Sequence, residues 1–175
     1  VELIDFCEKY AKPTYWIVNY SNPAAIVAKA TFRLRPNARI LNICDMPVAI
    51  ERNMAEILEC DRHDLEVDYF GLNHFGWFTK VRLKGEDVTE RLKAYVAKHG
   101  YMPQNEKSDV MHSDPSWLHT YGNAQHICSA FHDYLPNTYM QYYLLGDEVV
   151  ESSNPEHTRA NEVMEGREKR IFDAV

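Results

Sequence analysis

Two short apolar segments, each followed by a helix that opens with proline, constrain the fold of this chain more than any other feature. Residues 14–20 have the pattern of a buried strand, and the helix that follows has Pro23 at its first position. We expect that helix to run to about Leu34. Residues 39–44 then form a second apolar strand pattern, followed by a helix that Pro47 opens.

Strands that alternate with helices in this way indicate a parallel sheet covered by helices on both faces. In such sheets, ligands bind at the carboxyl ends of the strands. Asn22 follows the first expected strand, and Cys44 and Asp45 follow the second. These three residues therefore lie where a ligand site would form.

The pattern changes after about residue 64. Residues 65–72 alternate between apolar and polar side chains, and residues 77–83 alternate again before a turn at residues 84–85. These segments predict antiparallel strands in a second domain. An apolar stripe over residues 88–96 predicts a helix that ends at Gly100.

The rest of the second half is less regular. Residues 101–116 look like a loop, and a long helix is expected to start at Pro155 and to be unfinished at Val175. Residues 134–143 are rich in tyrosine. Such a stretch can line a polar sugar pocket or fill a core.

Charge and hydropathy exclude several classes of function. The formal net charge is −7 and no run of Lys or Arg is present, so we expect neither a nucleic-acid partner nor a basic membrane-binding patch. No apolar run has the length of a membrane-spanning helix, and residues 1–5 lack the features of a signal peptide. These observations favour a soluble cytoplasmic protein.

The cysteines are widely spaced and form no CxxC pair, which argues against a disulfide framework or a structural zinc knuckle. One of them, Cys44, and His74 each follow an expected strand, and a thiolate with an imidazole can form half of a transition-metal site. The alternative is a buried cysteine and a core histidine. Asp45 can act as an acid or base beside that metal, or can cap the next helix.

Four further histidines recur about every seventh residue, which on a helix could align them toward a metal ion. Exposed histidines in a polar stretch are more often unliganded. These residues are His112, His119, His126 and His132.

Five strings occur in order along nearly the whole chain. They are SNPA at residues 21–24, ICDMP at 43–47, GLNHFGW at 71–77, LPNTY at 135–139 and NPEHTRANE at 154–162. Together they closely resemble glycoside hydrolase family 4. The CDMP string resembles the branch of the family that acts on 6-phospho-α-glucosides such as maltose 6′-phosphate.

The resemblance implies a role for each candidate residue. Cys44 and His74 would bind a divalent metal, usually manganese. Asp45 would be the general acid and Tyr139 the general base. Asn22 and Arg159 match positions that hold the phosphorylated glucosyl unit in this family.

The resemblance also implies an unusual reaction. NAD oxidises the C3 hydroxyl of the sugar to a ketone, which acidifies the C2 proton, and a base removes that proton while the C1 substituent departs. Hydrolysis by this route is an exception to the two-carboxylate rule of glycosidases. A free tyrosine has a pKa of about 10, so Tyr139 could act as the base near neutral pH only beside a cation or metal.

The chain also departs from the family pattern. A glycine-rich turn that cradles the NAD pyrophosphate is expected before Tyr15, and none is present. The chain also stops inside an expected helix. We therefore expect an internal fragment of a larger enzyme, with little activity of its own, whose full-length form is a homo-oligomer.

The expected fold class is α/β. Residues 1–60 would form the second half of a Rossmann-like parallel sheet resembling lactate and malate dehydrogenases, and residues 61–175 part of a mixed α+β catalytic domain. Two alternatives remain at this stage. One is a hydroxyacid dehydrogenase, and the other is a binding or oligomerisation fragment without activity.

Overall fold

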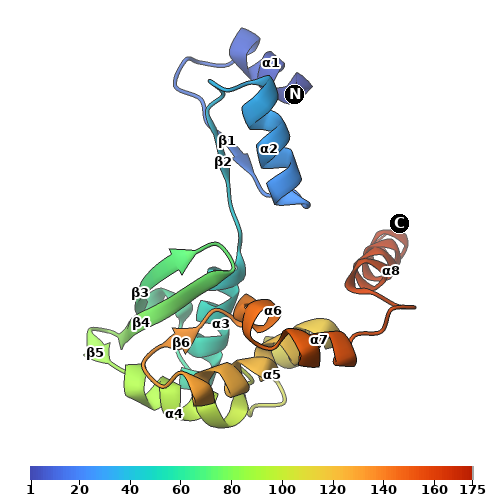
Figure 1. Cartoon of the computed structure of the whole chain (residues 1–175). Coiled ribbons are helices and arrows are strands. Elements are labelled where there is room, and N and C mark those ends of the chain that lie inside the picture. The colour runs from blue at the N-terminus through green and yellow to red at the C-terminus, as the bar shows by residue number, and fades with distance from the viewer. Residues whose placement is uncertain (175) are drawn as a thin grey trace. The chain divides into compact units, whose positions relative to one another are not determined.

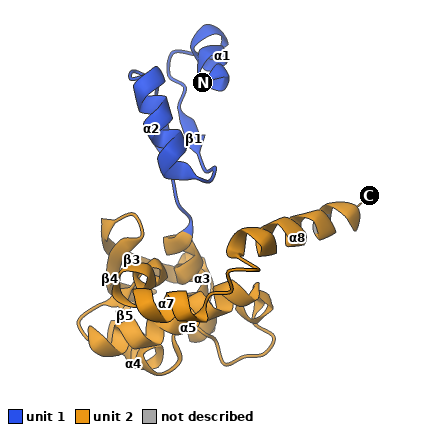
Figure 2. Ribbon diagram, turned by 45° about the vertical axis from the view of Figure 1, so that its right-hand side comes forward, with its two compact units in different colours: residues 1–45 blue, residues 46–175 orange. Residues whose placement is uncertain are grey.

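The computed structural model of the chain describes residues 1–174. It contains two compact units, Val1–Asp45 (unit 1) and Met46–Val175 (unit 2), which Figure 2 colours separately. We describe each unit by itself. Across residues 1–174, no helix combines the length and apolar character that crossing a membrane requires.

Unit 1 has the expected alternation of strands and helices, preceded by a helix that the sequence did not predict. In chain order it contains α1 (Glu2–Tyr10), β1 (Ile17–Asn19), α2 (Ala24–Leu34) and β2 (Ile40–Asn42) (Figure 1). The strands pair in parallel, with Ile17 opposite Ile40 and Asn19 opposite Asn42. Pro23 has extended backbone angles and caps α2 from outside, so the expectation that it is the first helical residue was wrong by one position.

Unit 1 has little core of its own. Ile4 and Thr31 are its buried residues, while large apolar side chains are exposed on its strands and helices. These include Trp16, Val18, Ile26, Phe32 and Leu41. A parallel sheet of two strands has two unpaired edges and normally needs further strands and covering helices to be stable.

The sheet of unit 2 is antiparallel, as the alternating segments predicted. β3 (Leu65–Leu72) pairs with β4 (Phe75–Leu83), and β4 pairs with β5 (Glu86–Asp87) and with β6 (Leu135–Pro136). β3 begins and ends at the expected residues. Together, the parallel pair in unit 1 and this mixed α+β unit confirm the fold class.

The other elements of unit 2 are mainly helical. They are α3 (Met46–Leu58), η1 (Arg62–Asp64), α4 (Thr89–His99), η2 (Asp109–His112), α5 (Pro115–Ala130), η3 (Thr138–Met140), α6 (Gln141–Leu144), α7 (Gly146–Ser152) and α8 (Arg159–Phe172). The predicted helix that ends at Gly100 is confirmed, and that glycine has the positive φ of 63° that a helix end favours.

The core of unit 2 lies between its sheet and its helices. Ile50 and Met54 of α3, Phe78 of β4 and Leu92 of α4 are fully buried. Tyr101 is also fully buried, and its hydroxyl donates to the Pro136 carbonyl at 2.9 Å. Because the buried side of α3 belongs to this core, that helix groups with unit 2, and a domain boundary at residue 60 stays a prediction from sequence.

Expectations about two segments of the second half were wrong. The last helix begins at Arg159 rather than Pro155, because Thr158 and Asn161 form a capping box that sets its start. It ends at Phe172, before Val175, which lies outside the described residues. The loop expected over residues 101–116 contains the short helix η2 and the first turn of α5.

Candidate active site

Three of the six candidate residues lie where β1 and β2 of unit 1 end. Asn22 follows β1, and Cys44 and Asp45 follow β2. The strand ends are joined by side chains, since Asn19 Nδ2 donates to Asn42 Oδ1 at 2.8 Å and Ser21 Oγ donates to Asn19 Oδ1 at 2.7 Å. The parallel register thus brings the two loops that carry these candidates to the same edge of the sheet.

Asp45 accepts a hydrogen bond from the hydroxyl of Tyr20. That bond, followed by burial, raises the pKa of Tyr20 to about 12. Cys44 beside it is half-buried, and no disulfide joins the four cysteines of the chain.

The other three candidates lie in unit 2, where a tight hairpin places His74. β3 and β4 pair up to Leu72 and Phe75, so Asn73 and His74 form a two-residue turn. His74 has a φ of 65°, a left-handed conformation that histidine adopts more readily than most residues. Burial lowers the pKa of His74 from its ordinary value, which keeps the imidazole neutral, as a metal ligand must be.

Tyr139 is placed by the segment that pairs with the base of this hairpin. Asn137 N donates to the Gly76 carbonyl at 2.9 Å, and Asn137 Nδ2 donates to the Tyr69 hydroxyl at 3.0 Å. Asn137 Oδ1 in turn accepts from the backbone N–H of Tyr139 at 3.0 Å. One buried asparagine therefore fixes the short helix η3 against the hairpin.

This arrangement brings Tyr139 and His74 together. Their ring centroids are 4.3 Å apart, with an angle of 55° between the ring planes. A side chain at Gly76 would collide with the Tyr69 hydroxyl and would approach the Phe70 carbonyl oxygen to 2.8 Å. Gly76 therefore lets the Tyr69 side chain of β3 pack closely against β4.

Arg159, the first residue of α8, is held by two carboxylates. Its Nη1 donates to Asp114 Oδ2 at 3.0 Å and to Glu162 Oε2 at 2.5 Å. Burial alone would lower the pKa of Arg159, but the hydrogen bonds to Glu162 and Asp114 outweigh it and raise that pKa. Ser116 also donates to Glu162, at 2.5 Å. The guanidinium is thus charged and fixed in orientation.

Trp117 connects Arg159 to the other two residues. The Arg159 Cζ lies 4.9 Å from the centroid of the Trp117 ring. The same indole lies 6.0 Å from the ring of Tyr139. Three candidates far apart in sequence, His74, Tyr139 and Arg159, therefore form one connected array in unit 2.

Sequence reasoning missed several members of this array. Asp114 lies in the stretch that was interpreted as a loop, and Trp117 lies directly after it. Glu162 lies within the NPEHTRANE string and follows Arg159 by three residues, a spacing at which helical side chains meet. That spacing was a usable signal for the ion pair.

The histidine repeat forms no metal centre in the part of the chain that the structure describes. No group of three or more His, Cys, Asp or Glu side chains comes together there to hold an ion. His119 and His126 lie two turns apart on α5, about 10 Å along the helix axis. His119 Nε2 instead forms hydrogen bonds with Asn123 and Ser152.

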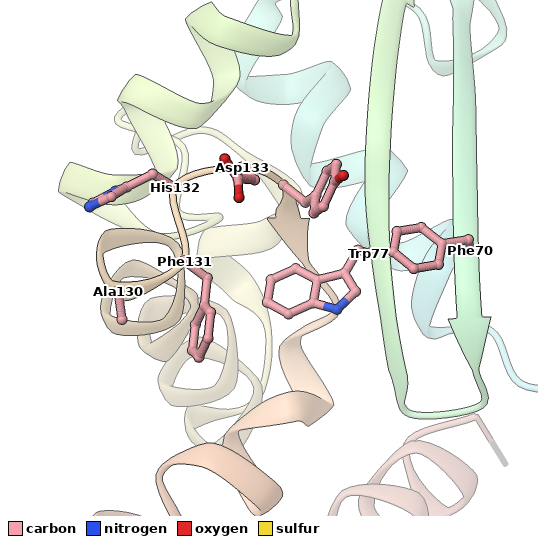
Figure 3. A pocket seen from close by; sticks show the side chains of 7 residues that line it. Phe70, Trp77, Ala130, Phe131, His132 and Asp133 are labelled. Carbon is pink, nitrogen blue, oxygen red and sulfur yellow. The ribbon is translucent and has the colours of Figure 1, made fainter.

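A separate hollow of about 430 Å³ opens beside the sheet of unit 2. Figure 3 shows its aromatic walls, with Trp77 and Phe70 projecting from the sheet side and Phe131 facing them. Tyr134 of the tyrosine-rich stretch also lines it. None of the six candidate residues is among its lining residues, so the array and this hollow are different features.

The chain belongs to family 4 of the glycosyl hydrolases. The model of the family 4 glycosyl hydrolase C-terminal domain matches residues 69–175, and that of the family 4 glycosyl hydrolase matches residues 1–60. The resemblance inferred from the five strings is therefore confirmed.

Similar curated proteins include maltose-6′-phosphate glucosidases and 6-phospho-α-glucosidases. The chain is 53% identical over 174 residues to the maltose-6′-phosphate glucosidase MalH of Clostridium acetobutylicum, covering 98% of this chain and 39% of that protein. It is 54% identical to the maltose-6′-phosphate glucosidase of Bacillus subtilis, covering 98% and 38%. The chain thus spans about two fifths of the length of these relatives.

Solved structures of 6-phospho-α-glucosidases are also similar to this chain. A 6-phospho-α-glucosidase from gut microorganisms in complex with NAD and glucose 6-phosphate is 61% identical and has a TM-score of 0.86, covering 99% of this chain and 39% of that one. A second from gut microorganisms, in complex with NAD and Mn²⁺, is 46% identical with a TM-score of 0.82, covering 99% and 40%.

Proposed function

We propose that this chain is the catalytic segment of an enzyme that hydrolyses 6-phospho-α-glucosides, such as maltose 6′-phosphate, with NAD and a divalent metal, manganese, as cofactors. The array of His74, Tyr139 and Arg159 carries the proposal, because it brings an imidazole, a phenol and a fixed cation together. The relative bound to NAD and glucose 6-phosphate matches 99% of this chain, which supports the same substrate class.

We assign the metal to Cys44 and His74. A thiolate and a neutral imidazole can both bind a first-row divalent metal, and two protein ligands leave coordination positions open for the substrate oxygens that manganese favours. When bound, the metal would polarise the hydroxyl oxygens on C2 and C3 of the sugar. His74 can bind only through an unprotonated ring nitrogen, which the lowered pKa provides.

We assign proton removal at C2 to the phenolic oxygen of Tyr139. The neighbouring ring of His74 fixes the position of Tyr139, together with the hydrogen bond that the Tyr139 backbone N–H donates to Asn137 Oδ1. NAD would supply the acceptor for the hydride at C3 and the donor that returns it once water has re-added at C1, so that the net reaction is hydrolysis. The deprotonated phenolate then takes the C2 proton, and Asp45 gives its proton to the departing oxygen at C1.

Arg159 and Asn22 would hold the phosphorylated glucosyl unit. Both carboxylates that fix Arg159 accept from Nη1, so we assign its Nη2 and Nε donors to the substrate. A planar guanidinium suits a phosphate because two donors can meet two oxygens at once. Asn22 offers an amide at the carboxyl end of β1, where ligands of parallel sheets bind.

Hydrolysis by a full-length form, meaning this chain within a protein as long as its curated relatives, tests the proposal. We expect release of glucose 6-phosphate from maltose 6′-phosphate that requires both NAD and manganese. Activity that survives removal of both would contradict it. A hydroxyacid dehydrogenase would instead oxidise a hydroxyacid and reduce one NAD for each molecule oxidised.

The chain by itself should have little or no glycosidase activity. Measuring its melting temperature with NAD, manganese or glucose 6-phosphate added separately shows which ligands it retains. Turnover of a 6-phospho-α-glucoside by the isolated chain at an ordinary rate would contradict the expected inactivity.

We further propose that the full-length form is cytoplasmic and homo-oligomeric.

A further inference from the structure

The loops that follow β1 and β2 carry a contact that the functions assigned above do not use. Asn19 and Asn42 are opposite each other in the parallel register and are joined by a hydrogen bond between their side chains. Tyr20 is the next residue after β1, and Asp45 lies three residues after β2. Because this hydrogen bond holds the two strand ends together, it also fixes the distance between the two loops.

At this point the Tyr20 hydroxyl donates to Oδ2 of Asp45. The phenol must keep its proton to serve as a donor. An ordinary tyrosine has a pKa of about 10, so the phenol keeps its proton through the neutral range. Tyr20 is therefore unsuited to act as a base, in contrast to the function proposed for Tyr139.

We propose that Tyr20 is a positioning residue for proton delivery by Asp45. The Tyr20 hydroxyl holds Oδ2 of Asp45 and thereby turns Oδ1 toward the leaving group. The proposal rests on the proposed function, in which Asp45 is the general acid. As the C1–O bond breaks, its electron pair moves to the departing oxygen. The proton of Asp45 moves to the same oxygen, which leaves a carboxylate that the Tyr20 hydroxyl stabilises.

A positioning function and a purely structural one differ in how they depend on the leaving group. A glucose leaving group, as in maltose 6′-phosphate, needs a proton as it departs. A 4-nitrophenolate leaves without one. Loss of the Tyr20 hydroxyl should therefore affect the first substrate and spare the second, whereas a damaged fold would slow both.

The test compares Tyr20→Phe, Asp45→Asn and the double variant in the full-length form on the two substrates. We expect Tyr20→Phe to lower turnover of maltose 6′-phosphate about tenfold, the effect of losing a hydrogen bond to a charged group. Turnover of 4-nitrophenyl 6-phospho-α-glucoside should change less than about twofold. The double variant should be no slower than Asp45→Asn, because both changes disable one proton transfer.

Tyr15→Phe is the matched control, since it removes a phenolic oxygen five residues away and should leave both rates unchanged. If Asp45→Asn is selective for the poor leaving group but Tyr20→Phe is normal, or slows both substrates equally, the positioning proposal is overturned and the proposed function stands. If Asp45→Asn slows both substrates equally, Asp45 is not the acid, and the proposal fails together with that assignment.

Discussion

The guanidinium of Arg159 lies over the indole of Trp117, with Cζ 4.9 Å from the ring centroid. The ring of Tyr139 lies 6.0 Å from the same indole. Trp117 therefore lies between Arg159, which is assigned to the sugar phosphate, and Tyr139, which is assigned to the C2 proton.

Replacing Trp117 should weaken binding of the phosphorylated sugar. Trp117→Leu removes the aromatic face under Arg159, and we expect glucose 6-phosphate to bind about fivefold more weakly, within the range of cation–π energies. Trp117→Phe should lose less, because an aromatic face remains. Titration calorimetry on the full-length form measures both.

Trp77→Leu, in the separate aromatic hollow, is the matched control and should bind normally. Equal affinities for wild type and Trp117→Leu would show that the indole does not orient Arg159.

Cys44→Ser should abolish metal binding and activity in the full-length form. A serine hydroxyl is a much poorer ligand than a thiolate for a soft metal site. Manganese binding measured by electron paramagnetic resonance, alongside turnover, checks this. Cys60→Ser is the control, because Cys60 lies after α3 and is not a candidate ligand. Normal manganese-dependent turnover of Cys44→Ser would remove Cys44 from the metal site.

The stability of unit 2 should depend on pH through Asp87. Hydrogen bonds from the Thr89 hydroxyl and backbone lower the pKa of Asp87 to about 2, from 3.8. A lowered pKa in the folded state means that the stabilisation is fully present above the unfolded value and is lost as the pH falls toward 2. Urea unfolding between pH 6 and pH 2 measures it.

Asp87→Asn should flatten this acid loss of stability, because no carboxylate remains to titrate there. Asp147→Asn on the exposed helix α7 should keep the wild-type slope. Identical acid slopes for Asp87→Asn and wild type would contradict the prediction.

Helices and strands could be predicted where residues close together in the sequence determine them. β3 alternates along its length and was predicted at the observed residues, and Gly100 ends α4 as expected. α5 was missed because its apolar residues do not gather on one side. The start of α8 was misplaced because Pro155 and the capping box at Thr158 give competing signals, and the cap sets the start.

The candidate site could be predicted as a set of residues and not as an arrangement. The five strings identify His74, Tyr139 and Arg159, but periodicity cannot show that a hairpin turn meets a short helix from much later in the chain. Trp117 and the Tyr20 hydroxyl contribute through tertiary contacts that no local pattern encodes.

The central claim, that Tyr139 removes the C2 proton, is tested most directly by its replacement with phenylalanine. Tyr139→Phe keeps the ring beside His74 and loses only the phenolic oxygen, so affinity for metal and sugar phosphate should be nearly unchanged. Turnover should fall by orders of magnitude, the usual effect of losing a general base.

The decisive measurement is deuterium incorporation at C2 from heavy water, recorded together with turnover in the full-length form. The account predicts that Tyr139→Phe stops this exchange, while oxidation at C3, which does not need this base, still yields a trace of NADH. Exchange that continues at the wild-type rate in Tyr139→Phe would contradict it.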